Sequence, residues 1–202
     1  RTSSPTLAFS ATKFFNDHDI PWEWVRSESV HEAEGFTLTN AYERTGQLGP
    51  DRWYAAIGAL SLFRGTPLLV VHAGTATTVD SLFQTGDGEY RFMGGRIAPG
   101  PALMHKALLS AVPTLDSGLT EHKDFPLCSS DAITTGIIDA QVGLITQAYE
   151  SMYEAGQRPK IILAGGSSRF LAPRLRTLHP TLIVRHNLVL GGLAQKARES
   201  KR

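Results

Sequence analysis

The first third of the chain contains few regularly spaced hydrophobic residues. Between residues 7 and 15, leucine, alanine and phenylalanine recur three and four residues apart, which predicts a short helix that ends at the polar residues 16–19. Residues 21–25 alternate between apolar and polar side chains and predict a short strand. Residues 27–49 are polar and contain glycine, so we expect a long loop there, and loops of that length are often functional.

From residue 51 onward the spacing becomes regular and predicts alternating helices and strands. Trp53, Ile57, Leu60 and Phe63 recur at helical spacing, and the helix is expected to stop at residues 65–67, Gly-Thr-Pro. The further elements predicted are strands at 68–72, 77–83 and 90–97, helices at 101–111 and 131–153, a strand at 160–164, a helix at 169–178, a strand at 182–184 and a helix at 188–198. The sequence Thr-Gly-Asp-Gly at 85–88 predicts a hairpin between the second and third of these strands.

This order of elements resembles the ribonuclease H-like layout of the actin and sugar-kinase superfamily. Three antiparallel strands come first, and helices and strands then alternate. The resemblance implies an α/β fold in which two such domains flank a nucleotide cleft. We expect residues 66–202 to form a complete second domain and residues 1–65 to be the remainder of the first, carrying a substrate-binding loop.

Composition and charge exclude several classes of protein. The 202 residues contain 20 Lys and Arg against 19 Asp and Glu, so the basic surplus of a nucleic-acid-binding module is missing. The longest apolar run, residues 68–71, is far too short to cross a membrane. Cys128 is the single cysteine, which excludes an intrachain disulfide and favours a reducing, cytoplasmic setting. We therefore expect no nucleic-acid partner and no membrane partner.

Asp51 lies where the loop meets the first regular helix, which gives its carboxylate two possible roles. It can cap the helix N-terminus, with Arg52 as a surface partner. Alternatively, it can act as a general base that accepts a proton from a substrate hydroxyl, while Arg52 pairs with an anionic group. The spacing alone leaves both roles open.

Three glycine-containing segments are candidates for nucleotide contacts. In residues 72–80 a strand enters a turn at Gly74 and Thr75 and returns as a strand, a geometry that can present N–H groups and hydroxyls to phosphates or simply close a tight hairpin. The segment 94–104, Gly-Gly-Arg-Ile-Ala-Pro-Gly-Pro-Ala-Leu-Met, is consistent with ordinary turn chemistry. The Gly-Gly-Ser at 165–167 lies between a strand and a helix and suits contact with a nucleotide's sugar or base. The histidines show no HxH or HExxH spacing, so we expect no transition-metal site.

Taken together and in order, these segments resemble those of type III pantothenate kinases, a family that includes proteins named Bvg accessory factor. The motifs are Asn-x-Tyr at 40–42, Gly-x-Asp-Arg-Trp at 49–53, Ala-Gly-Thr-Ala-Thr-Thr-Val-Asp at 73–80, Gly-Gly-x-Ile-x-Pro-Gly-x-x-Leu-Met at 94–104 and Gly-Gly-Ser at 165–167. The resemblance extends from about Trp24 to Leu193.

The resemblance implies ATP-dependent phosphorylation of pantothenate to 4′-phosphopantothenate, the first step of coenzyme A biosynthesis. It assigns Asp51 as the proton acceptor and catalytic residue, and Gly74 and Thr75 as ATP contacts. It assigns the pantothenate contacts to Tyr42, Gly49, Pro50, Asp51, Arg52 and Ser129, the last in place of the family's threonine. It further implies ATP and Mg²⁺ as cofactors, and a homodimer whose pantothenate pocket lies at the subunit interface.

Two positions depart from the family pattern. His72 occupies the position of an aspartate that binds a monovalent cation, K⁺ or NH₄⁺, and histidine is a poor potassium ligand, so the cation is either dispensable or its site is lost. A protonated His72 is one hypothesis for a substitute positive charge. The family's N-terminal Asp-x-Gly-Asn-Thr phosphate loop is not found, and the sequence begins at Arg1 without methionine. We therefore expect an N-terminally incomplete chain that is inactive or impaired as given.

Two alternative functions follow from the same residues. The first is a catalytically impaired relative that serves as a regulatory or accessory protein. The second is a different actin-like sugar kinase or ATPase, which Asn-x-Tyr at 40–42 and the segment 49–53 disfavour because they resemble a pantothenate pocket.

Overall fold

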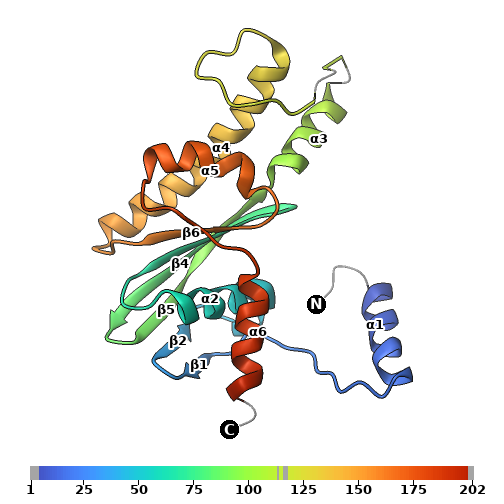
Figure 1. Cartoon of the computed structure of the whole chain (residues 1–202), viewed down its shortest axis with the longest axis vertical. Coiled ribbons are helices and arrows are strands. Elements are labelled where there is room, and N and C mark those ends of the chain that lie inside the picture. Colours follow the sequence, from blue (N-terminus) through green and yellow to red (C-terminus); the bar gives the residue numbers. More distant parts are fainter. Residues whose placement is uncertain (1–4, 113, 116–117, 200–202) are drawn as a thin grey trace.

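The computed structural model describes residues 5–112, 114–115 and 118–199, so that Arg1 lies outside it. The described residues form a seven-stranded sheet with the strand order β1-β2-β5-β4-β3-β6-β7 (Figure 1). The strands are β1 (Val30–Ala33), β2 (Phe36–Asn40), β3 (Leu68–Ala73), β4 (Ala76–Gly86), β5 (Glu89–Pro99), β6 (Lys160–Ala164) and β7 (Ile183–Val184).

Five of these strands form a ribonuclease H-like sheet. β4 is antiparallel to both β3 and β5, whereas β6 runs parallel to β3 and β7 parallel to β6. Three antiparallel strands followed by two parallel ones in the spatial order β5-β4-β3-β6-β7 confirm the predicted α/β class. The β4–β5 hairpin turns where Thr-Gly-Asp-Gly predicted it, since β4 ends at Gly86 and β5 begins at Glu89.

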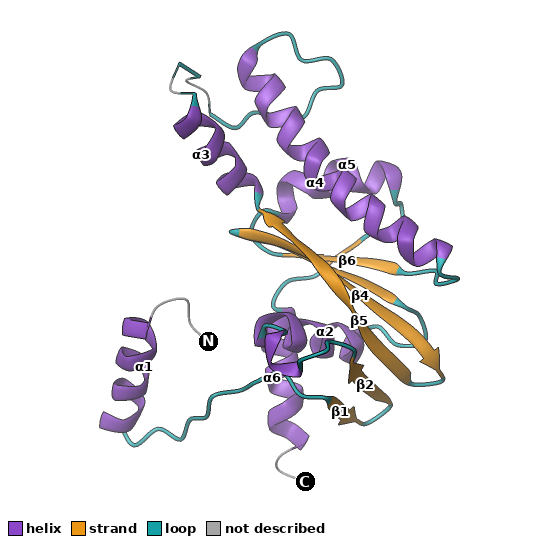
Figure 2. Ribbon diagram, turned by 180° about the vertical axis from the view of Figure 1, so that it is seen from behind, coloured by secondary structure: helices purple, strands orange, loops and turns teal. Residues whose placement is uncertain are grey.

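Helices cover both faces of the sheet. They are α1 (Pro5–Asp17), α2 (Pro50–Leu62), α3 (Pro101–Ala111), α4 (Ser129–Glu154), α5 (Ser168–Leu178) and α6 (Leu188–Glu199), with a 3-10 turn at Thr45–Gln47. α2 and α6 pack on one face, and α4 and α5 on the other (Figure 2). Leu68 and Val70 contact the first pair, whereas Leu69 and Val71 contact the second, because alternate side chains of a strand point to opposite faces. A strand buried on both faces explains the uninterrupted apolar run at 68–71.

Two glycines allow the helices α2 and α6 to cross at very short range. A Cβ atom on Gly192 of α6 would collide with the carbonyl oxygen of Tyr54, and one on Gly58 of α2 would collide with the carbonyl oxygen of Leu188. The two backbones therefore touch, and this contact fixes α2, whose first turn carries Asp51, against the C-terminal helix.

The substitution Gly192→Ala is expected to lower the free energy of unfolding by about 1–3 kcal/mol, because the added methyl overpacks this crossing. Gly191→Ala is the matched control: its Cβ would meet nothing nearer than Gly58 Cα at 3.8 Å, so alanine's better helix propensity should leave stability unchanged or slightly raised. Urea unfolding followed by circular dichroism measures both variants. Equal stability of the two would contradict the predicted close crossing.

The structure corrects two predictions for the N-terminal third. The short strand predicted at 21–25 is wrong: the segment is irregular, and Trp22 and Trp24 contact each other edge-to-face while remaining partly exposed. Nothing in the described part of the sheet pairs with it, and an unpaired strand is not stable. The long loop predicted at 27–49 instead contains β1 and β2, which extend the sheet beside β5.

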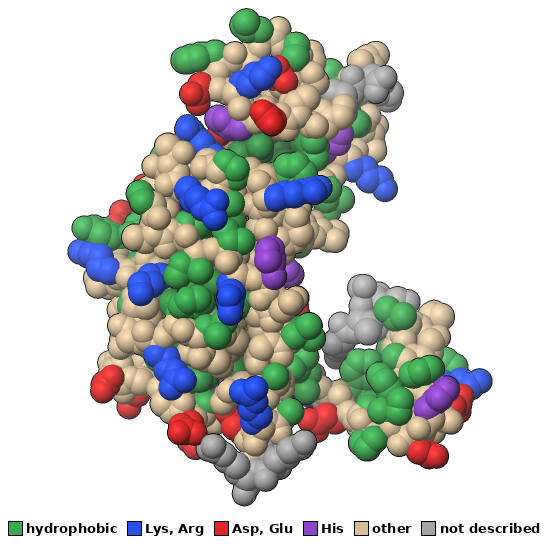
Figure 3. Space-filling view, viewed as in Figure 1, with side chains coloured by type: hydrophobic (Ala, Val, Ile, Leu, Met, Phe, Trp, Pro, Cys, Tyr) green, Lys and Arg blue, Asp and Glu red, His purple; other side chains and the backbone are tan. Residues whose placement is uncertain are grey.

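The helix predicted near residues 7–15 is confirmed as α1, but it has no buried residue and stands apart from the sheet (Figure 3). Hydrophobic side chains gather on its surface, among them Leu7, Phe9 and Phe14. The domain division at residue 65 stays a prediction. In the described chain β1 and β2 continue the same sheet as the downstream strands.

Within the described residues, no helix combines the length and the apolar character needed to span a bilayer. Cys128 is an exposed thiol that precedes α4.

Candidate active site

The start of α2 and the β3–β4 turn face one cavity of about 230 Å³. Four charged or titratable residues line it, Asp51 and Arg52 from α2, His72 from β3 and Asp80 from β4, together with the turn residues Gly74 and Thr75. The structure thus brings five of the predicted site residues to one place, although they are separated by about twenty residues in the sequence. The role of each residue there stays a prediction.

Asp51 lies in the first turn of α2 but is not its cap. Gly49 is the N-cap residue, Pro50 is the first helical residue and Asp51 is the second. The capping interpretation was therefore wrong in position, although an acidic side chain in the first turn still interacts favourably with the helix dipole. The Asp51 carboxylate reaches back over Gly49, where a Cβ atom would collide with it. Gly49 therefore leaves room for this orientation, and the carboxylate stays exposed to the cavity.

Arg52 forms a buried ion pair with Asp80 of β4. Its Nε and Nη2 groups both donate to Asp80 Oδ1, at 2.9 and 2.5 Å, and the two residues are 7% and 2% exposed. The capping alternative, in which Arg52 is a surface partner, was therefore wrong in this respect as well, because Arg52 is buried. Its anionic partner in this structure is a carboxylate of the chain itself.

Tyr42 completes the environment of Arg52. The Nη1 group of Arg52 donates to the Tyr42 hydroxyl at 2.9 Å, and the guanidinium lies 5.8 and 5.7 Å from the ring centroids of Tyr42 and Phe92. Asn40 restrains the backbone at Tyr42, because its side-chain Oδ1 accepts a hydrogen bond from the Tyr42 N–H at 3.0 Å. The Asn-x-Tyr motif is thus a local turn that aims the phenol at Arg52.

Burial and pairing shift the pKa of both partners. Burial raises the pKa of Asp80 to about 6, although the hydrogen bonds and charge of Arg52 act in the opposite direction. Burial alone would lower the pKa of Arg52, but Asp80 and Tyr42 raise it above its usual value. Arg52 is therefore charged at neutral pH, and its hydrogen bonds and charge favour the ionised form of Asp80.

His72 faces the same cavity as Asp51. Burial lowers the pKa of His72 below its ordinary value, and the nearby charge of Asp51 opposes that change. A lowered pKa means that the imidazole is mainly neutral at neutral pH, which counts against the hypothesis that a protonated His72 supplies a positive charge.

The other glycine motifs pack against the backbone that forms the cavity. Gly95 lies inside β5, within the strand predicted at 90–97, and a Cβ atom there would collide with the Arg52–Asp80 pair. Gly100 packs on the carbonyl oxygen of Gly74, and Gly165, with φ of +96°, packs on the carbonyl oxygen of Ala73. The segments 94–104 and 165–167 therefore converge on the β3–β4 turn and the ion pair beneath it.

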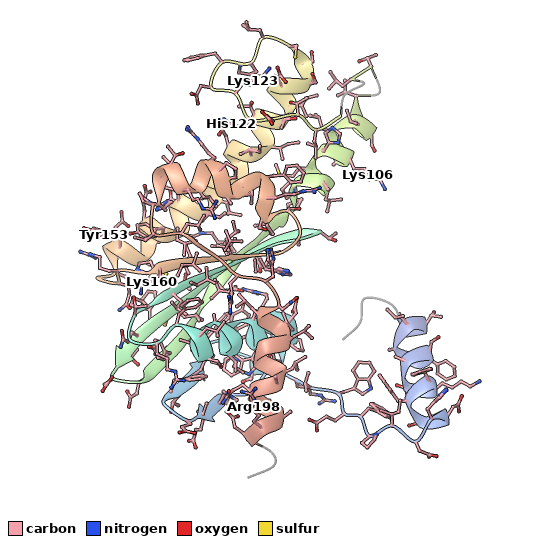
Figure 4. The ribbon with its side chains drawn as sticks, viewed as in Figure 1. Lys106, His122, Lys123, Tyr153, Lys160 and Arg198 are labelled. Carbon is pink, nitrogen blue, oxygen red and sulfur yellow. The ribbon has the colours of Figure 1, made fainter. Side chains whose placement is uncertain are left out.

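Ser129 is not brought to this cavity. It is the first residue of α4, and that end of α4 projects away from the sheet together with α3 (Figure 1). Figure 4 labels His122 and Lys123 at this projecting tip and Lys106 on α3, all far from α2. Within one chain Ser129 and Asp51 do not contact the same pocket.

A second hollow, of about 470 Å³, lies between β1 and the end of α6. Several of its charged groups contact one another: Lys196 Nζ is 2.5 Å from Glu28 Oε1, and the buried His31 ring lies between Glu28 and Glu199. It contains none of the predicted site residues, so the smaller cavity at Asp51 is the better candidate for chemistry.

Sequence reasoning missed the role of Asp80. A charged residue in the middle of a strand signals that a buried partner is needed if the strand is covered, but that signal does not say which residue supplies the partner. The partner lies 28 positions earlier, on a helix.

The residues at the cavity fit a nucleotide phosphate better than a dedicated metal site. The described residues contain no group of three or more His, Cys, Asp or Glu side chains placed to hold a metal ion. Asp80 is engaged by Arg52, which leaves Asp51 as the available carboxylate in the cavity. Mg²⁺ commonly needs only one or two carboxylates when substrate phosphates supply the other ligands, so this donor set is compatible with a metal that arrives bound to ATP.

Comparisons with known proteins show the family of the chain. Residues 3–151 match the family model for type III pantothenate kinase. The chain is 36% identical over 184 residues to a type III pantothenate kinase of Acidovorax ebreus, covering 89% of this chain and 67% of the relative. It is 38% identical over 177 residues to the one of Methylobacillus flagellatus, covering 86% and 69%. The chain thus spans about two thirds of the length of these relatives.

A solved structure supports the fold. A Campylobacter jejuni protein described as a Baf family transcriptional activator matches with a TM-score of 0.54 and 23% identity, over 80% of this chain and 67% of that one.

The five-stranded ribonuclease H-like sheet, with a cavity lined by an exposed carboxylate and a Gly-Thr turn, has the α/β architecture that the sequence predicts. The sequence identity to the curated relatives shows which family the chain represents. The chain belongs to the type III pantothenate kinase family.

Proposed function

We propose that this chain carries the active site for ATP-dependent phosphorylation of pantothenate to 4′-phosphopantothenate. Membership of the family supports the reaction, and one observation supports the site: the Asp51 carboxylate and the Gly74–Thr75 turn line the same cavity. A proton acceptor and a phosphate-binding turn that line one cavity are what phosphoryl transfer to an alcohol requires.

Asp51 would act as the general base. It accepts the proton of the pantothenate 4′-hydroxyl as that oxygen bonds to the γ-phosphorus of ATP, and the bond from this phosphorus to the bridging oxygen breaks to release ADP. Phosphoryl transfer depends mainly on positioning and on neutralising charge, so no covalent intermediate with the protein is needed. Mg²⁺ bound to the phosphates would supply part of that neutralisation.

Arg52 would hold pantothenate next to Asp51. An arginine side chain carries five N–H groups, and three of them are used by Asp80 and Tyr42, so others remain for a substrate oxygen. The ion pair and the Tyr42 contact fix the plane of the guanidinium before substrate arrives. Such preorganisation reduces the conformational entropy that the Arg52 side chain loses when substrate binds.

The position of Ser129 supports a homodimeric site. Because Ser129 lies on the projecting end of α4, it can contact pantothenate only if a second copy brings that end to the cavity of the first. We therefore propose a dimer in which each pantothenate pocket draws residues from both chains. Sedimentation should give the mass of two chains, and a monomeric active enzyme would exclude this role for Ser129.

Potassium should have little effect on this enzyme. His72 stands where the family has a cation-binding aspartate, and potassium sites in proteins are built from oxygen donors. We expect kcat to be unchanged when Na⁺ replaces K⁺ in the assay, and the variant His72→Asp to become dependent on K⁺. A strong potassium requirement of the unmodified enzyme would show that another group binds the cation.

The direct test is a coupled assay of ADP release from the complete gene product, with ATP and Mg²⁺, in the presence and absence of pantothenate. Pantothenate-dependent ADP release, with 4′-phosphopantothenate identified by mass spectrometry, supports the proposal. Binding of pantothenate without turnover would instead favour the catalytically impaired accessory protein.

A further inference from the structure

We propose that Gln141 is a positioning residue for ATP, acting through the end of β5 on the Gly74–Thr75 turn. Gln141 lies in the middle of α4, on the opposite face of the sheet from α2, and does not line the cavity. The inference rests on the proposed function, because it assigns to that turn the nucleotide contact described above.

The side chain of Gln141 is inserted between α4, β5 and α3. It is 1% exposed, and its Nε2 group donates to the carbonyl oxygen of Pro99 at 2.9 Å and approaches Met104 Sδ at 3.0 Å. A carbonyl oxygen only accepts hydrogen bonds, so the amide nitrogen must be the atom that faces Pro99. Gln141 thereby holds the last residue of β5.

The next residue transmits this restraint to the turn. The Gly100 N–H donates to the carbonyl oxygen of Thr75 at 2.8 Å, and its Cα packs against the carbonyl oxygen of Gly74 so closely that no side chain would fit. The Gly74 N–H in turn donates to the Ala76 carbonyl oxygen at 3.0 Å. The path from Gln141 to Thr75 therefore consists of two hydrogen bonds and one peptide link.

The Oε1 atom of Gln141 indicates that the amide serves as a hydrogen-bond donor and not merely as packing volume. Its Oε1 is buried and has no hydrogen-bond partner among the described residues, and an unpaired buried acceptor costs stability. A methionine of similar volume would fill the same space without that cost. The donor function toward Pro99 is the property that only the amide supplies.

The substitution Gln141→Met tests the inference. Loss of one hydrogen bond that holds the turn should raise the KM for ATP by about five- to tenfold, while the KM for pantothenate stays within about twofold. Gln147→Met, on the exposed surface of the same helix, is the matched control and should change neither constant. The melting temperature of Gln141→Met should change little, because loss of the hydrogen bond to Pro99 and removal of the unpaired Oε1 have opposite effects on stability.

Hydrogen exchange gives a second measurement that does not depend on turnover. Amides of residues 74–76 and 100 should exchange faster in Gln141→Met than in Gln147→Met. Unchanged exchange there, or equal rises in KM for both substrates, would overturn the inference. If the unmodified protein itself released no ADP with pantothenate, the proposed function would fail, whereas the exchange measurement would still decide whether Gln141 restrains the turn.

Discussion

Asp51→Asn is expected to lower kcat by about 10²–10⁴-fold, with little change in the KM for either substrate. Asparagine keeps the size of the side chain and can still hydrogen-bond a hydroxyl, but it cannot take up the proton that the attacking oxygen loses. The carboxylate is exposed to the cavity and makes no ion pair with Arg52, whose partner is Asp80. The substitution therefore removes the base without disturbing the buried pair beneath it.

Stability measurements separate this effect from unfolding. Asp51 lies in the first turn of α2, so loss of its charge should lower the free energy of unfolding by only about 0.3–1 kcal/mol. Asp87→Asn, in the exposed β4–β5 turn, is the control and should retain full activity. Turnover of Asp51→Asn at the unmodified rate would mean that another group accepts the proton, and His72 in the same cavity would then be the next candidate.

The downstream strands could be predicted because their sequence signals are local. The run at 68–71 and the Thr-Gly-Asp-Gly at 85–88 each determine a feature that lies within a few residues of themselves. β2 alternates apolar and polar residues at Phe36-Thr37-Leu38-Thr39, which is a strand signal, but the polar residues around it were interpreted as one long loop. What the sequence could not show is its partner, because β2 pairs with residues 89–92 of β5, some fifty positions later.

The same distinction separates the parts of the site. Asp51 and the Gly74–Thr75 turn could be identified because each lies at a boundary between elements that the sequence itself marks. The Arg52–Asp80 pair could not, because it depends on how α2 lies across the sheet. The requirement for glycine at position 95 could not be predicted either, because it arises from the ion pair that packs against Gly95.

Asp80→Leu is expected to lower the free energy of unfolding by about 3–5 kcal/mol. Leucine has the branching of aspartate but no charge, so it would leave the guanidinium of Arg52 buried without a counter-ion. The neighbouring Tyr42 hydroxyl accepts one hydrogen bond from Arg52 but cannot balance its charge. Asp124→Leu, which removes the partner of Arg174 in an exposed pair 3.8 Å apart, is the control and should change stability by no more than about 0.5 kcal/mol.

The double variant Arg52→Met, Asp80→Leu decides what the pair does. Replacing both partners of a buried ion pair with apolar residues is often neutral for stability, so we expect the double variant to recover most of the loss. It should nevertheless bind pantothenate at least about tenfold more weakly, because the proposed substrate contact of Arg52 is gone. Recovery of stability without recovery of binding would show that the pair is retained to place a charged group beside Asp51. If the double variant bound pantothenate normally, Arg52 would have a structural role only and would not contact the substrate.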